Sequence, residues 1–211
     1  MTASAALRPG RIYAIADAEA LAPRRLSEAA VAMAEAGILT IQLRAKRFPD
    51  DLFFAETERC LRRLEGWAGT LWIDDRVDLA MLLPLSGVHL GRTDLPAAMA
   101  RRLLSSTVRI GVSTHDEEQL VEADQETSAD WIALGPIFAT QSKRDADPVV
   151  GVERLRELRR RTSKPLIAIG GIGQQNIAAV LEAGVDSVAV IRAVCSGDVV
   201  RNCRELLSAA A

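Results

Sequence analysis

Eight short apolar runs alternate with helix-like segments along almost the whole of this 211-residue chain, and this alternation constrains the fold more than any other feature. The runs are rich in Ile, Val and Leu and are apolar on both faces, as in parallel strands that are covered on both sides. Strands that alternate with helices form βαβ units and hence a parallel sheet. The predicted strands are residues 11–17, 39–45, 70–75, 87–91, 109–114, 131–137, 165–171 and 187–193.

The segments between these runs have helical spacing. The predicted helices are residues 26–36 (followed by Gly37 as a C-cap), 51–64, 96–104, 116–126, 152–161, 174–183 and 198–209, with a short connection at 77–83. Eight βα units in about 200 residues is the smallest usual size of a TIM barrel. We therefore predict an α/β fold, a TIM (βα)8 barrel, as one domain over residues 1–211, with 1–10 as a flexible N-terminal extension. An open doubly wound sheet is the alternative, because periodicity does not show closure.

Net charge and composition limit the classes of partner and the compartment that we expect. The formal net charge is −2, so the whole chain carries no signal for nucleic acid or an anionic membrane. No apolar run approaches the roughly 20 residues that span a bilayer, and the N-terminus lacks the apolar core of a secretory signal. Three cysteines without a C-x-x-C pair favour a reducing cytoplasm. The sequence is compatible with a homo-oligomer but does not predict an oligomeric state.

Polar residues gather where the predicted strands end, which is the edge at which barrels and open α/β sheets bind ligands. Gln42, Arg44 and Lys46 are spaced by two and share one face of a strand. Two cations that face a barrel interior need an anion, because an unpaired buried charge is very costly. A bound anion is the favoured interpretation. A salt-bridged strand end, with Asp74 or Asp75 as the partner, is the alternative.

Asp75 and Asp94 follow neighbouring strands. Carboxylates of this kind suit Mg²⁺, which binds a few carboxylates, waters and substrate phosphates. The alternative is that each carboxylate caps the helix that follows it. Together with Arg44, Lys46 and Lys143, the two residues favour a metal–polyphosphate site.

A second subsite is predicted at the later strands. Residues 170–173, Gly-Gly-Ile-Gly, follow the seventh strand and precede a predicted helix, where backbone amides can approach a phosphate. The sixth strand breaks at Gly135-Pro136, so that Thr140, Ser142 and Lys143 can reach between the two subsites. Tight turns also favour glycine, so this motif alone is moderately specific.

Two histidines lie at strand ends, and neither belongs to a nucleophile constellation. His89 and His115 are more simply explained as hydrogen-bonded structural residues. No His/Cys cluster has the spacing of zinc ligands, and the cysteines are predicted to be buried.

Taken in order, the motifs YAIAD, IQLRAK, IDDRVDLA, GVHLGRTD, GVSTH, ALGPIFATQSK, PLIAIGGI and SVAVI resemble the successive strand ends of the thiamine phosphate synthases and their thiazole tautomerase relatives. The resemblance runs from about residue 12 to residue 195. It implies a transferase of thiamine biosynthesis that joins a hydroxymethylpyrimidine pyrophosphate to a thiazole phosphate and releases pyrophosphate, with Mg²⁺ as the cofactor and these two small molecules as its partners.

The resemblance also implies roles for individual residues. The pyrimidine pyrophosphate would be held by Gln42, Arg44, Lys46, Asp74, Ser113 and Lys143, among which Arg44, Lys46, Lys143 and Ser113 are the expected catalytic residues. Mg²⁺ would be held by Asp75 and Asp94. The thiazole phosphate would be held by Thr140, Ser142, Gly171, Ile191 and Arg192.

The chain departs from the family pattern at three positions. Asp74 stands where Asn is usual, Arg92 where Gln is common, and Arg192 where a small residue is common. An extra carboxylate beside pyrophosphate is repulsive unless Mg²⁺ or Arg76 compensates for it. An arginine at 192 can bind phosphate through its fork.

Two other functions stay open. One is a tautomerase-type isomerase with His115 as the acid–base, for which two metal carboxylates and three cations have no use. The other is a non-catalytic phosphate-binding homologue, for which Asp74 is the only argument.

Overall fold

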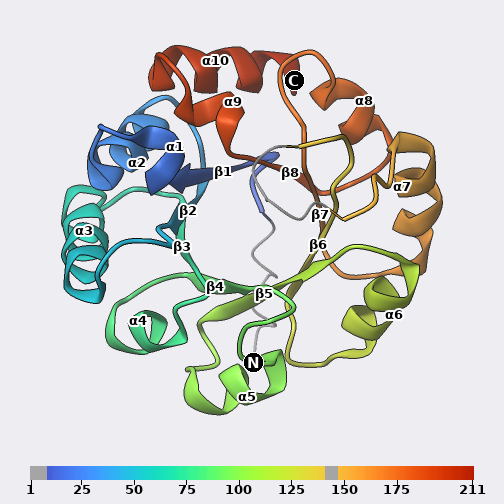
Figure 1. The fold of residues 1–211 in the computed structure, drawn as a ribbon, viewed down its shortest axis with the longest axis horizontal. Helices are drawn as coiled ribbons and strands as arrows, with labels where there is room; N and C mark the ends of the chain where they lie inside the picture. The colour runs from blue at the N-terminus through green and yellow to red at the C-terminus, as the bar shows by residue number, and fades with distance from the viewer. Residues whose placement is uncertain (1–8, 141–146) are drawn as a thin grey trace.

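The computed structural model describes residues 9–140 and 147–211. Its eight strands form one closed parallel barrel in which each strand pairs with the next and β8 pairs with β1. A ring of helices surrounds the strands (Figure 1). Closure confirms the predicted TIM barrel and excludes the open sheet.

All strands but β5 are shorter than predicted, mainly at their C-terminal ends. They are β1 (Ile12–Asp17), β2 (Thr40–Arg44), β3 (Thr70–Asp74), β4 (Gly87–Leu90), β5 (Arg109–Thr114), β6 (Trp131–Leu134), β7 (Leu166–Ile169) and β8 (Ser187–Val190). After β6 the chain enters a cis Gly135–Pro136 bond. The Ile137 amide still donates to the Ile169 carbonyl at 2.9 Å, so the two loops after β6 and β7 run together at the mouth.

The helices match the prediction within a few residues except at three places. They are α1 (Ala18–Leu21), α2 (Leu26–Glu35), α3 (Asp50–Arg63), α4 (Val77–Leu82), α5 (Ala97–Leu103), α6 (Glu117–Gln125), α7 (Val152–Leu158) with the 3₁₀ turn η1 (Arg159–Arg161), α8 (Ile177–Glu182), α9 (Arg192–Cys195) and α10 (Val199–Ala209). The four-residue helices α1 and α9 were not predicted. The helix expected from residue 174 begins at Ile177, because Gly173 first donates to the Asn176 side chain at 2.9 Å.

Aromatic rings fill the barrel beneath its mouth. Trp72 and Trp131 stack with ring centroids 4.1 Å apart, and Tyr13 lies against both. Gly87 makes room for this stack, since a Cβ there would come within 2.5 Å of the Trp72 ring. The strands' outward side chains pack against the helices in a second, larger core. The barrel is therefore closed below by close-packed rings.

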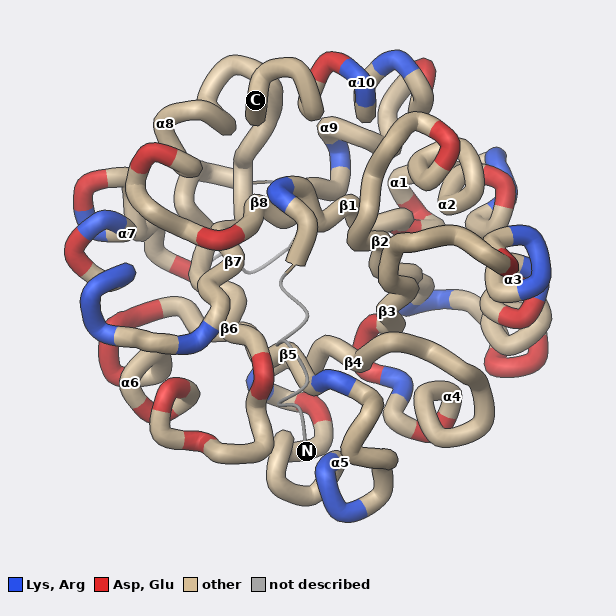
Figure 2. Tube along the Cα trace, turned by 180° about the vertical axis from the view of Figure 1, so that it is seen from behind, with Lys and Arg blue, Asp and Glu red and all other residues tan. Residues whose placement is uncertain are grey.

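Charged residues lie mostly on the helical ring, while the strands carry few of them (Figure 2). Among the described residues, no helix is long and apolar enough to cross a membrane. Most of the predicted N-terminal extension falls on residues 1–8, outside the described part. Gly10 is tied to the barrel, because its amide donates to Thr40 Oγ1 at 2.9 Å and its carbonyl accepts from Ser187 Oγ at 2.6 Å.

Candidate active site at the carboxyl ends of the strands

A cavity of about 870 Å³ opens at the C-terminal ends of the strands. Most of the site residues predicted from the sequence line it, although they come from six different strands or strand ends. Its lining includes Gln42, Arg44, Asp74, Ser113, Thr140, Gly171, Ile191 and Arg192. The fold thus brings both predicted subsites to one opening.

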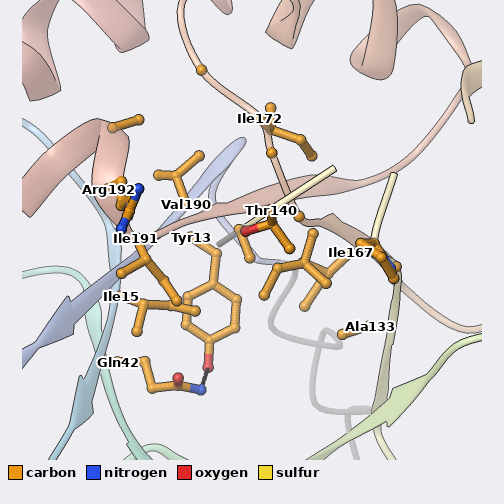
Figure 3. Close-up of a pocket in the computed structure, with 18 of the residues that line it drawn as sticks. Tyr13, Ile15, Gln42, Ala133, Thr140, Ile167, Ile172, Val190, Ile191 and Arg192 are labelled. Carbon is orange, nitrogen blue, oxygen red and sulfur yellow. Dashed lines mark hydrogen bonds between the residues drawn. The ribbon is translucent and has the colours of Figure 1, made fainter. Parts of the chain in front are cut away.

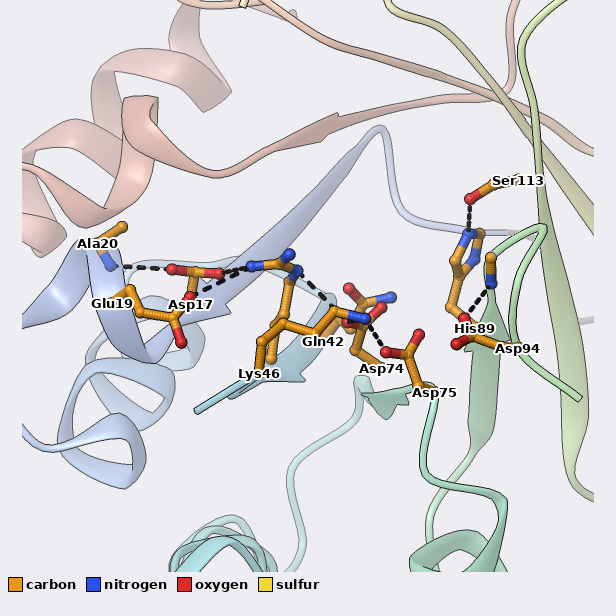
Figure 4. Close-up of polar contacts among 12 residues, drawn as sticks. Asp17, Glu19, Ala20, Gln42, Lys46, Asp74, Asp75, His89, Asp94 and Ser113 are labelled. Carbon is orange, nitrogen blue, oxygen red and sulfur yellow. Dashed lines mark hydrogen bonds and ion pairs between the residues drawn. The ribbon is translucent and has the colours of Figure 1, made fainter. Parts of the chain in front are cut away.

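Charges of alternating sign form a row from β1 to the end of β3 (Figure 4). Arg44 pairs with Asp17 through Nη1 and approaches Asp74 Oδ2 with Nε at 3.3 Å. Lys46 Nζ lies 3.2 Å from the same Asp74 oxygen and also pairs with Asp75. The ion pairs expected for a salt-bridged strand end are therefore present, and they place two cations side by side at the rim.

Asp74 is the member of this row that contacts both cations. Its side chain is 11% exposed. Burial raises the pKa of Asp74, although Lys46 and Arg44 oppose this shift, and the charge of Asp94 adds to it. Arg76 does not compensate for Asp74, because it pairs with Asp50 and Asp78 at 2.7 and 2.6 Å. The carboxylate that departs from the family pattern is therefore offset by the two predicted diphosphate ligands.

Neither Asp75 nor Asp94 caps a helix through its side chain, so the capping alternative is wrong for both. The helices that follow begin after Arg76 and Pro96, and neither start has a side-chain cap. Asp94 Oδ2 instead accepts the Gly91 amide at 2.7 Å. Asp75 has a φ of 60°, a left-handed conformation that is uncommon for non-glycine residues and marks functional sites when surrounding structure enforces it.

The donor chemistry of these carboxylates fits a hard divalent cation. The described residues hold no group of three or more His, Cys, Asp or Glu side chains placed to bind a metal. Mg²⁺ does not need one, since it is usually held by one or two carboxylates with waters and substrate phosphates. The carboxylate oxygens of Asp75 and Asp94 are therefore of the kind that Mg²⁺ binds.

The other side of the cavity is mostly neutral. Thr140, Ile191 and Arg192 surround it above the ring of Tyr13 (Figure 3). Arg192 begins helix α9, whereas the sequence placed it at the end of the eighth strand. Gly170 and Gly171 have φ of 102° and 65°. A Cβ at Gly170 would lie 2.6 Å from Pro136, so these glycines are needed for loop packing as well as for any approach of a phosphate.

Both histidines line the cavity and are hydrogen-bonded. His89 Nε2 lies 2.9 Å from Ser113 Oγ. His115 Nδ1 donates to the Gly135 carbonyl at 2.6 Å and lies 3.4 Å from Asp147 Oδ2. The three cysteines are buried and form no disulfide, as predicted, and burial raises the thiol pKa of Cys60 to about 12.

Comparison with known proteins decides the family. A sequence profile described as thiamine monophosphate synthase matches residues 12–194. The chain belongs to this family. The thiamine-phosphate synthase of Koribacter versatilis is 42% identical over 189 residues, which cover 88% of this chain and 89% of that relative. That of Methanoculleus marisnigri is also 42% identical, over 92% of each chain.

Solved structures agree with the sequence relatives. Thiamine phosphate pyrophosphorylase from Pyrococcus furiosus is similar with a TM-score of 0.84 and 31% identity, over 95% of each chain. The tryptophan synthase A-subunit from Pyrococcus furiosus has a TM-score of 0.73 at 13% identity, which shows a shared fold and no more. The resemblance and the fold predicted from the motifs are confirmed.

Two residues that contact predicted ligands were not predicted from the sequence, and two predicted ligands lie outside the described part. Asp17 and Tyr13 were not singled out. Asp17, the last residue of β1, stands opposite Arg44 on the neighbouring strand, a pairing that depends on the strand register. Tyr13 accepts a hydrogen bond from Gln42 Nε2 at 2.9 Å. The predicted ligands Ser142 and Lys143 lie outside the described residues.

Proposed function

We propose that this chain is a thiamine phosphate synthase, which joins 4-amino-2-methyl-5-hydroxymethylpyrimidine pyrophosphate to thiazole phosphate and releases pyrophosphate. The observation that carries the proposal is the pair of cations, Arg44 and Lys46, held beside Asp74 and Asp75 at the mouth of the cavity. A monophosphate isomerase has no need of such a row. Membership of the family supports the same conclusion.

The predicted roles divide the cavity between the substrates. Gln42, Ser113 and Arg44 line the side on which we place the pyrimidine and its diphosphate, with Lys46 at the rim. Thr140, Gly171, Ile191 and Arg192 line the side on which we place the thiazole phosphate. Lys143 and Ser142 are assigned by the family resemblance alone.

Asp75 and Asp94 are the residues that we expect to hold Mg²⁺. When bound, the ion would offset the charge of the diphosphate. Asp75 also pairs with Lys46, so an ion bound by Asp75 would lie close to one of the cations expected to hold the diphosphate. Free, buried thiols at Cys60, Cys195 and Cys203 support a reducing cytoplasm as the place of action.

The chemistry needs positioned charge more than acid–base groups. The bond between the pyrimidine methylene and the diphosphate oxygen breaks, and both of its electrons leave with pyrophosphate. The aminopyrimidine delocalises the resulting positive charge, and the thiazole nitrogen then forms the new C–N bond. Arg44 and Lys46 stabilise the charge that develops on the leaving group, and the cavity holds the two rings together.

A coupling assay with both substrates, with and without Mg²⁺, tests this proposal by following the release of pyrophosphate. We expect turnover that depends on the metal, and Arg44→Ala should lower it by at least about 100-fold. Arg154→Ala is the matched control, because Arg154 lies on α7 and pairs only with surface carboxylates in the described structure. Metal-independent isomerisation of a carboxylated thiazole phosphate, without coupling, would instead support the isomerase. Binding without turnover would support the non-catalytic homologue.

A further inference from the structure

Asp17 is a buried carboxylate that the family resemblance assigns to no role. It ends β1, directly opposite Arg44 of β2, and its side chain is 5% exposed. A buried charge persists only with a partner. Arg44 supplies that partner and also lines the cavity. Asp17 therefore touches the site through another residue.

The two oxygens of this carboxylate have different partners. Oδ1 accepts the Ala20 amide at 2.9 Å and so caps the short helix α1, and Oδ2 pairs with Arg44 Nη1. The cap fixes the carboxylate relative to the backbone. The oxygen that faces Arg44 is consequently held in place by the backbone of α1 (Figure 4).

Carboxylates contact the Arg44 guanidinium on two of its sides. Asp17 engages Nη1, Asp74 approaches Nε at 3.3 Å, and Glu19 lies 3.7 Å from Nη1. An arginine side chain has many rotamers, and holding it in one of them removes the entropic cost of ordering it on binding. Asp74 is shared with Lys46, whereas the described structure gives Asp17 no cation partner but Arg44.

We propose that Asp17 is a positioning residue that orients the Arg44 guanidinium toward the diphosphate of the substrate. The inference rests on the proposed function, because it names the residue that prepares one of its diphosphate ligands. The same side chain caps α1, so this helical turn and the arginine share one carboxylate.

The variant that tests this role is Asp17→Asn. Asparagine caps helices as well as aspartate and has the same size, so α1 and the packing are retained while the charge on Arg44's partner is lost. We expect the dissociation constant for inorganic pyrophosphate, measured by calorimetry with Mg²⁺, to rise about 10-fold. The KM for the pyrimidine diphosphate should rise similarly, and the KM for thiazole phosphate should change less than about twofold.

Asp198→Asn is the matched control. Asp198 caps α10 by accepting the Arg201 amide at 3.0 Å, and we expect that variant to bind pyrophosphate as the unaltered protein does. A purely structural role for Asp17 would lower the melting temperature and affect both KM values alike.

A double-mutant cycle separates an effect through Arg44 from a direct one. In an Arg44→Ala background, Asp17→Asn should weaken pyrophosphate binding by less than about twofold. Unchanged or tighter pyrophosphate binding by Asp17→Asn alone, or an equal loss in both backgrounds, would overturn the inference. Failure of the coupling assay would overturn the proposed function while the pyrophosphate measurement still decides the role of Asp17.

Discussion

Both ends of this barrel hold an aspartate beside two cations, but the two carboxylates differ in how well their charge is compensated. At the N-terminal end, Asp130 accepts Arg101 Nη2, Arg109 Nη1 and the Ile110 amide at 2.8–2.9 Å. At the mouth, Asp74 is buried, its pKa is raised and it shares one oxygen between Arg44 and Lys46. The charges around Asp130 are satisfied within the fold, whereas burial opposes the charge of Asp74, a condition that is common at functional sites.

The largest effect is expected for Asp75→Asn. Asparagine tolerates the left-handed backbone at this position, so the fold should survive, while the charge that we expect to hold Mg²⁺ is lost. We expect turnover with Mg²⁺ to fall by about 100-fold or more. Steady-state kinetics measure the loss of turnover, and a melting curve checks that the fold is retained. Near-normal turnover would remove Asp75 from the metal site.

Asp130→Ala tests the carboxylate at the N-terminal end of the barrel. It leaves Arg101 and Arg109 without their shared carboxylate, so we expect a loss of about 2 kcal/mol in unfolding free energy. Because the pairs are partly exposed, this figure is already reduced for screening by solvent. Urea unfolding gives the number, and kcat should be unchanged. A drop in kcat at constant stability would break the contrast between the two ends.

Asp74→Asn should act on stability in a pH-dependent way. The folded-state pKa of Asp74 is raised, so its ionisation weakens the fold as pH rises from the ordinary carboxyl pKa, about 3.9, through the raised value. Asparagine removes that loss, and the variant's unfolding free energy should fall less over this range. Turnover should be unchanged or higher. A steeper pH dependence than that of the parent chain would show that the ion pairs outweigh burial.

The smallest effect is expected for His115→Asn. Although His115 lies at the mouth, its Nδ1 donates to the Gly135 carbonyl and lies 3.4 Å from Asp147 Oδ2, and its backbone amide, which the substitution keeps, donates to Gln119 Oε1. Because Nδ1 has its partner within the fold, as the charges of the opposite end do, we expect turnover to fall by only a few-fold, well below the 100-fold or more that a lost general acid–base usually costs. Abolished turnover, measured in the same assay, would favour an acid–base role for this histidine.

The strands and long helices were predictable because each buries a face with a regular period. The four-residue helices α1 and α9 are too short to show one. The sequence also placed Arg192 on a strand, since the apolar run of β8 continues into Ile191 without a break. Which carboxylate pairs with which cation depends on register between strands, and this is how Asp17 escaped notice while Asp74 and Asp75 did not.

The stack of Trp72 and Trp131 also determines how deep the cavity can be. Because the stacked rings form a floor beneath the cavity, a molecule bound there is kept at the level of the strand ends, where the predicted ligands lie. The aromatic core therefore sets the depth of the site as well as filling the barrel.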